Sequence, residues 1–442
     1  MASFLDLPNE IIDQVLSHIP RCDLLSICLV NKALKHSAEP FLYSTITLKY
    51  DYPEFPPIAP LLCTLLRRPA LFDHINIVLL KGSGARTRTV PSMNTSTIPF
   101  DEFIAAVKKT KVQFTDIWID KLQAADTCFH ALAALLIAHL SKTTHLRIED
   151  AYINGQPLIS KIFQAKAFGQ LPIFERLREL RHDKRRDVSY PDSINNHIFE
   201  ETTSLFYVPT VVDLEVSVTN PETFRWPAGE PNLDRLTSLK IGWLCEPFLA
   251  KIFALTRNLR SLEWRWDDDG PENLGETAVI DFGKVSDAIQ PLKNTLEKLN
   301  FWFWLGLDDE RGNIVETNVR GNFRLRDFTR LADLNIPLTS RSATDWRPLA
   351  LEDYAPDSVE VLTLPGTALS NDFQPGLPGY WDNDEFESHE IVPLLQSLAD
   401  ARPEKLPRLR VVKILDNCAR VVHRSISRSV AELDLGFDVQ FD

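Results

Sequence analysis

A short hydrophobic motif recurs along most of this chain and limits what the chain can fold into. The motif is an apolar residue, two variable residues, and then two apolar residues separated by one position. Its clearest copies are LTSLKI (236–241), LRSLEW (259–264), LEKLNF (296–301), VEVLTL (359–364) and LRVVKI (409–414). The alternation that ends each copy is typical of a β-strand with one buried face. Each copy therefore predicts a strand.

Weaker copies and helical stretches fill much of the remaining chain. The weaker copies are HINI (74–77), TDIWI (115–119), THLRI (144–148), VVDLEV (211–216) and LADLNI (331–336). Apolar residues at helical spacing lie between the copies, at 100–110, 128–143 and 246–258. The chain is therefore expected to alternate strand and helix, which places it in the α/β class.

The ordered series of motifs resembles leucine-rich repeats. In such repeats each unit exposes an apolar edge that only the next unit covers. The spacing here is irregular, since the strand ends Ile241, Trp264 and Phe301 are 23 and 37 residues apart. The resemblance implies an irregular leucine-rich-repeat solenoid over residues 49–442. An ordinary α/β sheet domain, with its strands in another order, is the alternative.

The first fifty residues have a different pattern. The apolar residues Ile11, Ile12, Val15, Leu16 and Ile19 form one stripe on a helix that Pro8 begins and Pro20 ends. We expect Asp23 to cap a second helix and Asn31 to cap a third. Three short helices bury too little surface to be stable alone. They must pack against the rest of the chain, against a partner, or against both.

These N-terminal residues resemble the F-box. The match covers roughly residues 3–48, and we assign residues 1–48 to the first domain. The residues that carry the resemblance are Leu7-Pro8, Glu10-Ile11, Val15-Leu16, Pro20, Asp23-Leu24-Leu25, Leu29-Val30-Asn31 and Leu42-Tyr43. The resemblance implies docking on a Skp-type adaptor, which joins the chain to a cullin–RING ubiquitin ligase. A plain three-helix cap on a repeat domain is the alternative.

The resemblance also implies roles for individual residues. The residues expected to face the adaptor are Leu7, Pro8, Ile11, Ile12, Leu24 and Leu25. Val15, Leu16, Val30 and Leu34 are expected to hold the three helices together. The remainder of the chain would then bind a target protein.

Five polar or Pro/Gly-rich segments interrupt the repeats and are interpreted as loop insertions. They lie near 81–99, 182–197, 267–276, 307–318 and 365–390. Each follows an expected strand, which would place all five along one edge of a solenoid.

Composition and motifs argue against several classes of protein. The net charge of −13 is unlike the basic surface of a nucleic-acid binder. The longest apolar segment, 129–140, is too short to cross a bilayer, and the six cysteines form no C-x-x-C pair. We expect a cytoplasmic or nuclear protein that binds neither nucleic acid nor membrane.

Catalytic patterns are absent from the sequence. It contains no phosphate-binding loop, no G-x-S-x-G and no H-E-x-x-H. His197 and Glu200 lack a third metal ligand, and Asp267, Asp268 and Asp269 are interpreted as a solvated loop tip. We therefore expect no enzyme, no catalytic residue, no metal and no cofactor.

The expected strands also predict a binding face. Side chains alternate along a strand, so the residues between the apolar positions of the motif face away from the core. These residues are Trp118, Asp120, Arg147, Glu149, Lys240, Glu263, Arg265, Asn300, Trp302 and Trp304. Exposed tryptophans beside an arginine are typical of binding hot spots, so Arg265, Trp302 and Trp304 are the candidate substrate-binding residues. A register slip of one residue would instead turn Phe301 and Phe303 outward.

Together these features favour a substrate-recognition subunit of an SCF-type E3 ubiquitin ligase. The alternative function is a repeat-domain scaffold, or a non-degradative adaptor that uses its F-box only for complex assembly.

Overall fold

The computed structural model describes residues 7–51, 54–82, 98–153, 157–183, 199–218, 223–242, 244–267, 279–304, 318–321, 323–336, 354–365, 383–415, 433 and 435–441. The chain divides into two compact units, Met1–Arg235 and Leu236–Asp442. Both units combine helices with parallel strands, so the expected mixed α/β class is confirmed.

Unit 1 begins with three helices: α1 (Asn9–Ser17), α2 (Arg21–Val30) and α3 (Lys32–Ser44). Pro8 and Pro20 occupy the N-cap positions of α1 and α2. The prediction that Asp23 caps the second helix is therefore wrong, because this residue lies in the first turn of α2. Asn31 caps α3 as expected, and its Oδ1 accepts a hydrogen bond from the Leu34 N–H at 2.8 Å.

Five parallel strands follow in unit 1, and their spatial order is their order in the chain. They are β1 (Thr45–Lys49), β2 (Ile77–Lys81), β3 (His145–Glu149), β4 (Glu179–Asp183) and β5 (Asp213–Ser217). The strand register aligns buried residues in two rows. The first row is Ile46, Val78, Leu146, Leu180 and Leu214, and the second is Leu48, Leu80, Ile148, His182 and Val216. Each strand thus covers the apolar edge of its neighbour.

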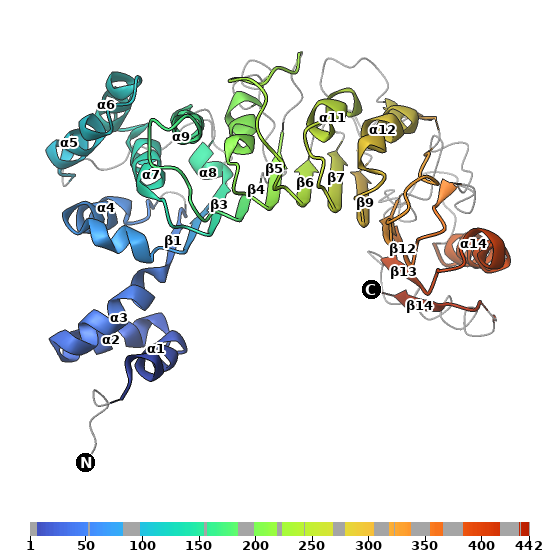
Figure 1. Ribbon diagram of the computed structural model, residues 1–442, viewed down its shortest axis with the longest axis horizontal. Helices are drawn as coiled ribbons and strands as arrows, with labels where there is room; N and C mark the ends of the chain where they lie inside the picture. The colour runs from blue at the N-terminus through green and yellow to red at the C-terminus, as the bar shows by residue number, and fades with distance from the viewer. Residues whose placement is uncertain are drawn as a thin grey trace. The chain divides into compact units, whose positions relative to one another are not determined.

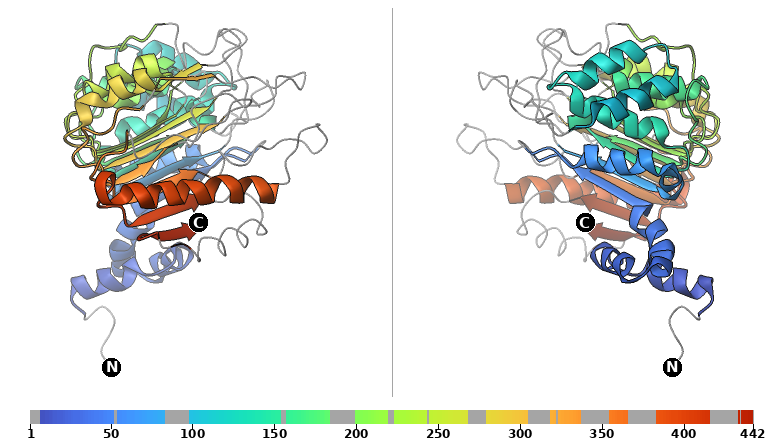
Figure 2. Two further views of the ribbon diagram at one scale, coloured as in Figure 1. Left: turned by 90° about the vertical axis from the view of Figure 1, so that its right-hand side faces the viewer. Right: turned by 90° about the vertical axis from the view of Figure 1, so that its left-hand side faces the viewer.

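Helices connect these strands and lie on one side of them (Figures 1 and 2). They are α4 (Ile58–Arg67), η2 (Pro69–His74), α5 (Phe100–Thr110), α6 (Thr115–Gln123), α7 (Cys128–His139), α8 (Asp150–Ile153), α9 (Leu158–Ala167) and η3 (Ser204–Tyr207). Helix α7 is buried on every side from Cys128 to Ala138, where His130 is the one residue that is not apolar. The Tyr152 hydroxyl of α8 donates to the Leu48 carbonyl of β1 at 2.9 Å. This hydrogen bond connects the helix layer to the sheet.

The segment TDIWI does not form a strand. It lies in helix α6, where Trp118 is fully buried and its indole N–H donates to the Ala131 carbonyl of α7 at 3.0 Å. Asp120 is exposed on the same helix. The prediction that Trp118 and Asp120 belong to a sheet face is therefore wrong. The physical reason is that α7 is apolar all round and needs a covering helix, which α6 provides.

Unit 2 repeats the parallel arrangement. Its strands are β6 (Ser238–Gly242), β7 (Ser261–Asp267), β9 (Lys298–Trp304), β11 (Asp333–Asn335), β12 (Val361–Pro365), β13 (Val411–Leu415) and β14 (Asp438–Phe441), in that spatial order. Its helices are α11 (Glu246–Phe253), α12 (Phe282–Ile289), η4 (Gln290–Leu292) and α14 (Asn383–Lys405). A separate small sheet pairs β8 (Val279–Asp281) with β10 (Asn318–Arg320).

Aromatic packing fixes the register of β7 and β9. Trp264 and Phe301 are in register and buried, with ring centroids 4.5 Å apart in an edge-on arrangement. The Trp264 indole N–H donates to the Leu244 carbonyl at 2.9 Å. Phe301 is therefore a core residue, and the alternative in which it faces outward is excluded.

The predicted loop insertions lie mostly outside the described residues. This holds for 83–97, 184–197, 268–276, 307–317 and 366–382. The end of the last insertion is different from the prediction, since 383–390 belongs to helix α14. Among the described residues, no helix is long and apolar enough to span a membrane.

Candidate interaction surfaces

The three N-terminal helices pack around a small apolar core. Its buried residues are Ile12, Leu16, Leu24 and Ala38, and partly buried Ile19, Ile27, Cys28, Phe41 and Leu42 surround them. Burial raises the pKa of the Cys28 thiol. We call residues 7–44 the three-helix module.

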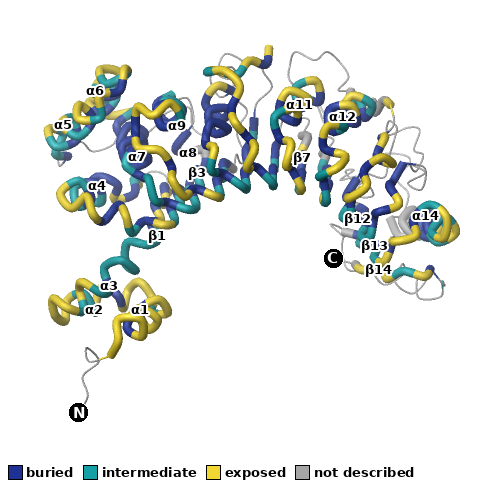
Figure 3. The backbone as a smooth tube through the Cα atoms, in the orientation of Figure 1, coloured by how far each residue is buried: buried dark blue, intermediate teal, exposed yellow. Residues whose placement is uncertain are grey.

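The same module exposes large apolar side chains on two of its helices. Leu7, Ile11 and Val15 at α1 and Leu25, Leu29 and Val30 at α2 have relative exposures between 42% and 87%. Ile11 and Val15 are four residues apart, as are Leu25 and Leu29, so each pair lies on one helix face. Both helices are largely exposed in Figure 3. Exposed apolar residues gathered on short helices are typical of a protein-binding site.

Of the six residues predicted to face an adaptor, four are exposed and two are buried. Leu7, Pro8, Ile11 and Leu25 are exposed, whereas Ile12 and Leu24 lie in the module's core. Ile12 and Leu24 therefore pack in the core beneath the exposed residues and do not face a partner. Of the residues predicted to hold the helices together, Leu16 is buried and Leu34 is partly buried, but Val15 and Val30 are exposed. Val15, Leu29 and Val30 are thus exposed as well, although they were not among the residues predicted to face an adaptor.

The module is joined to the first strand without a linker. Helix α3 ends at Ser44 and β1 begins at Thr45, while the Ser44 carbonyl accepts a hydrogen bond from the Asn76 N–H at 2.9 Å. Arg68, next to η2, donates to Glu39 of α3 at 2.6 Å and holds the pKa of that carboxyl below its ordinary value. These contacts fix α3 to the first strands of unit 1.

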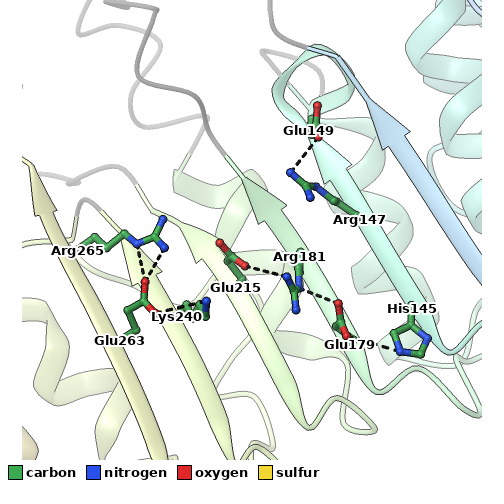
Figure 4. Close-up of polar contacts among 9 residues, drawn as sticks. All are labelled: His145, Arg147, Glu149, Glu179, Arg181, Glu215, Lys240, Glu263 and Arg265. Carbon is green, nitrogen blue, oxygen red and sulfur yellow. Dashed lines mark hydrogen bonds and ion pairs between the residues drawn. The ribbon is translucent and has the colours of Figure 1, made fainter. Parts of the chain in front are cut away.

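The open face of unit 1, opposite its helices, carries charged side chains that pair with one another (Figure 4). Arg181 lies 2.7 Å from Glu179 and 3.8 Å from Glu215, and His145 lies 3.6 Å from Glu179. Arg147 lies 3.1 Å from Glu149, whose carboxylate also accepts the Gly82 N–H at 2.7 Å. Carboxylates outnumber arginines here, so each arginine is already paired within the face.

On the open face of unit 2, the described side chains of β6 and β7 include two cations beside one carboxylate. Glu263 of β7 lies 3.4 Å from Lys240 of β6 and 2.6 Å from Arg265 of its own strand (Figure 4). The Glu263 carboxylate therefore forms ion pairs with two cations. In the same row, the Asn335 side-chain Nδ2–H donates to the Asn300 side-chain oxygen Oδ1 at 2.5 Å. These neutral groups continue the polar face across β9 and β11.

Trp302 lies next to this group of charges. It is in register with Arg265 on the neighbouring strand and is partly exposed, on the opposite side of β9 from the buried Phe301. Trp304 belongs to β9 as well, but its side chain lies outside the described residues. The structure thus brings Arg265 and Trp302 together, as the sequence predicted.

No group of three or more His, Cys, Asp or Glu side chains suited to a metal ion occurs among the described residues. His197 and the side chains of Asp267–Asp269 fall outside that part of the chain.

Comparison with known proteins identifies the N-terminal region. Residues 4–39 match the family model of the F-box domain. A search of curated proteins found no match to the chain. The matched segment includes α1, α2 and most of α3, with the module's core and its exposed apolar residues. Residues 4–39, which include most of the three-helix module, are an F-box domain.

Proposed function

We propose that this chain is a substrate-recognition subunit of an SCF-type E3 ubiquitin ligase. Its F-box domain docks on a Skp-type adaptor, and the open faces of its sheets bind a target protein. The chain itself is not an enzyme; it brings the target to the ligase in the cytoplasm or nucleus.

The observation that carries the proposal is the apolar surface of α1 and α2. Six large apolar side chains are exposed on elements whose own core is already filled by Ile12, Leu16, Leu24 and Ala38. Leaving such side chains in water costs roughly 25 cal/mol for each Å² that a partner could cover. A protein partner that covers this surface is therefore the simplest reason for its existence.

The remainder of the chain supports the target-binding half of the proposal. We interpret its strand–helix units as divergent leucine-rich repeats, because consecutive strands pair in parallel and in chain order within each unit. Helices cover one face of such strands and leave the other face to bind partners. The direct junction of α3 with β1 would hold an adaptor at a fixed position relative to the first strands.

The proposal is tested by truncating the exposed start of the F-box domain. We expect Leu7→Ala with Pro8→Ala to abolish capture of a purified Skp-type adaptor by the full chain. Interface anchors cost about 2–4 kcal/mol each when truncated, which is roughly 30- to 1000-fold in affinity. Because Leu7 and Pro8 lie outside the module's core, circular dichroism and thermal unfolding should not change.

A matched control removes two apolar side chains elsewhere in unit 1. Phe168 and Ile173 are as exposed as Leu25 but lie beyond helix α9. Phe168→Ala with Ile173→Ala should bind the adaptor as the wild type does. The proposal fails if the wild-type chain does not bind the adaptor, or if both double variants bind it equally well.

A further inference from the structure

One edge of the sheet in unit 1 has no neighbouring strand. β1 is the first strand in the spatial order of the sheet, so it pairs only with β2. The Tyr50 N–H, one residue beyond β1, donates to the Lys81 carbonyl of β2 at 2.8 Å. Backbone groups of successive strand residues point to opposite sides, so the even-numbered residues of β1 bond to β2. The residues that turn their N–H and C=O groups to the other side are Thr45, Thr47 and Lys49.

These backbone groups are unpaired and accessible. Within the described part of the chain, the N–H and C=O groups of Thr45, Thr47 and Lys49 make no hydrogen bond. Thr47 and Lys49 are exposed, and Thr45 is partly exposed. A row of unpaired N–H and C=O groups at an exposed sheet edge is a template for an added strand. We call these three residues the free edge.

The free edge has little protection against strand addition. Proteins commonly protect an exposed edge with charged side chains, proline or a bulge. β1 contains no proline, and its one charged residue is Lys49, whose Nζ lies 2.7 Å from the Asp51 carboxylate. Thr45 and Thr47 are uncharged and β-branched, which favours strand pairing. The side chains of β1 therefore permit a further strand beside it.

The free edge begins directly after the last helix of the three-helix module. Helix α3 ends at Ser44, and Thr45 is the first residue of β1 (Figure 1). The 13 residues of α3 span about 20 Å at 1.5 Å per residue. An extended chain covers that distance in about six residues. A partner that docks on α1 and α2 can therefore reach the free edge with a short extended segment.

We propose that the free edge binds an extended segment of the adaptor that docks on the F-box domain, and that this segment adds a strand beside β1. The continuity of α3 with β1 favours this occupant, because the two contacts would lie along one rigid element. The inference rests on the proposed function, since it names a second contact of the same partner.

The small size of the free edge also favours a segment of a partner that is already bound. Each of its three residues offers one N–H and one C=O, and each hydrogen bond contributes roughly two- to tenfold in affinity. A free peptide loses much of this gain through the freedom that it gives up on binding. A segment tethered to a docked partner has an effective concentration that is roughly millimolar, so it avoids most of that loss.

Recognition at the free edge would run through the backbone. The side chains of Ile46 and Leu48, on the helix side of β1, are already buried at 1% and 4% exposure. They therefore do not require an apolar side chain in the added strand. In strand addition the main-chain hydrogen bonds supply the affinity, so the segment needs an extended conformation more than a particular sequence.

The first experiment measures amide hydrogen exchange of the full wild-type chain with and without a purified Skp-type adaptor. The amides of Ile46 and Leu48 are already bonded to β2 in the free chain, so any gain of protection in β1 reports the free edge. The adaptor should slow exchange of the Thr45, Thr47 and Lys49 amides at least about tenfold, because each then donates to the added strand.

The second experiment compares two substitutions at the centre of the free edge. Thr47→Pro removes the outward N–H, and proline is tolerated on an edge strand where that group faces solvent. This variant should lower the affinity for the adaptor about tenfold. Thr47→Val is the matched control, because it keeps the N–H and the β-branched shape, and it should bind within about twofold of the wild type. Unchanged exchange in β2 confirms that both variants keep the sheet.

The inference is overturned if the adaptor protects α1 and α2 but leaves exchange in β1 unchanged, or if Thr47→Pro and Thr47→Val bind the adaptor equally well. It is also overturned if Thr47→Pro changes the oligomeric state of the chain without adaptor, since the free edge would then bind a second copy. These results leave the proposed function intact, whereas a wild-type chain that does not bind the adaptor would refute the proposed function itself.

Discussion

At the scale of single residues, a buried histidine makes the stability of this chain depend on pH. His130 of α7 is 5% exposed, and burial lowers the pKa of its imidazole to about 4. The unfolded chain has an ordinary histidine pKa near 6.5. Between these values the unfolded state binds more protons than the folded state, so the free energy of unfolding falls as pH falls from 6.5 towards 4.

We expect this loss to approach about 1.4 kcal/mol for each pH unit within that window. His130→Gln removes the titrating group, so its stability should fall less steeply with acid than that of the wild type. Urea unfolding at pH 7.5, 6 and 5 measures the difference. Parallel pH profiles for the two proteins would show that folding does not lower the pKa of His130.

The sequence predicted correctly which residues are buried where the alternation of apolar and polar residues along a strand was enough to decide it. Leu239, Ile241, Trp264 and Phe301 are core residues because they alternate along strands with polar residues. Ile11 and Ile12 show the limit of this reasoning. Adjacent positions on a helix are about 100° apart, so Ile12 packs inward while Ile11 is exposed. Only the packing of α1 against its neighbours decides which side is covered.

At the scale of elements, the segment TDIWI is the clearest failure of pattern reasoning. A short apolar run is equally compatible with strand and helix. The strand interpretation buries Ile117 and Ile119 and exposes Trp118, whereas helix α6 buries Trp118 and exposes Ile117. What decides between them is the neighbouring helix α7, whose apolar surface must be covered on all sides.

This contrast predicts effects of very different size for two neighbouring substitutions. Trp118→Ala should destabilise the chain by about 3–5 kcal/mol, because it empties a large buried site and leaves the Ala131 carbonyl without its indole partner. Ile117→Ala should change stability by no more than about 0.5 kcal/mol. Chemical denaturation of both variants is the check, and the reverse order of effects would favour the strand.

At the scale of the whole molecule, the chain separates two kinds of surface. The F-box domain exposes apolar side chains on short helices, and the sheets present charged side chains on faces free of helices. The sequence predicted this division because the F-box spacing and the strand motif occupy different parts of the chain. It could not predict the ion pair between Lys240 and Glu263, which depends on the register between β6 and β7 and not on either strand alone.

The central claim, that the F-box domain is the adaptor-binding surface, is tested most directly by amide hydrogen exchange of the full chain with and without a Skp-type adaptor. We expect the adaptor to slow exchange in α1 and α2, between Asn9 and Val30, and to leave β6 and β7 unchanged. Unchanged exchange in α1 and α2 at saturating adaptor, or protection confined to the strands, would contradict the claim.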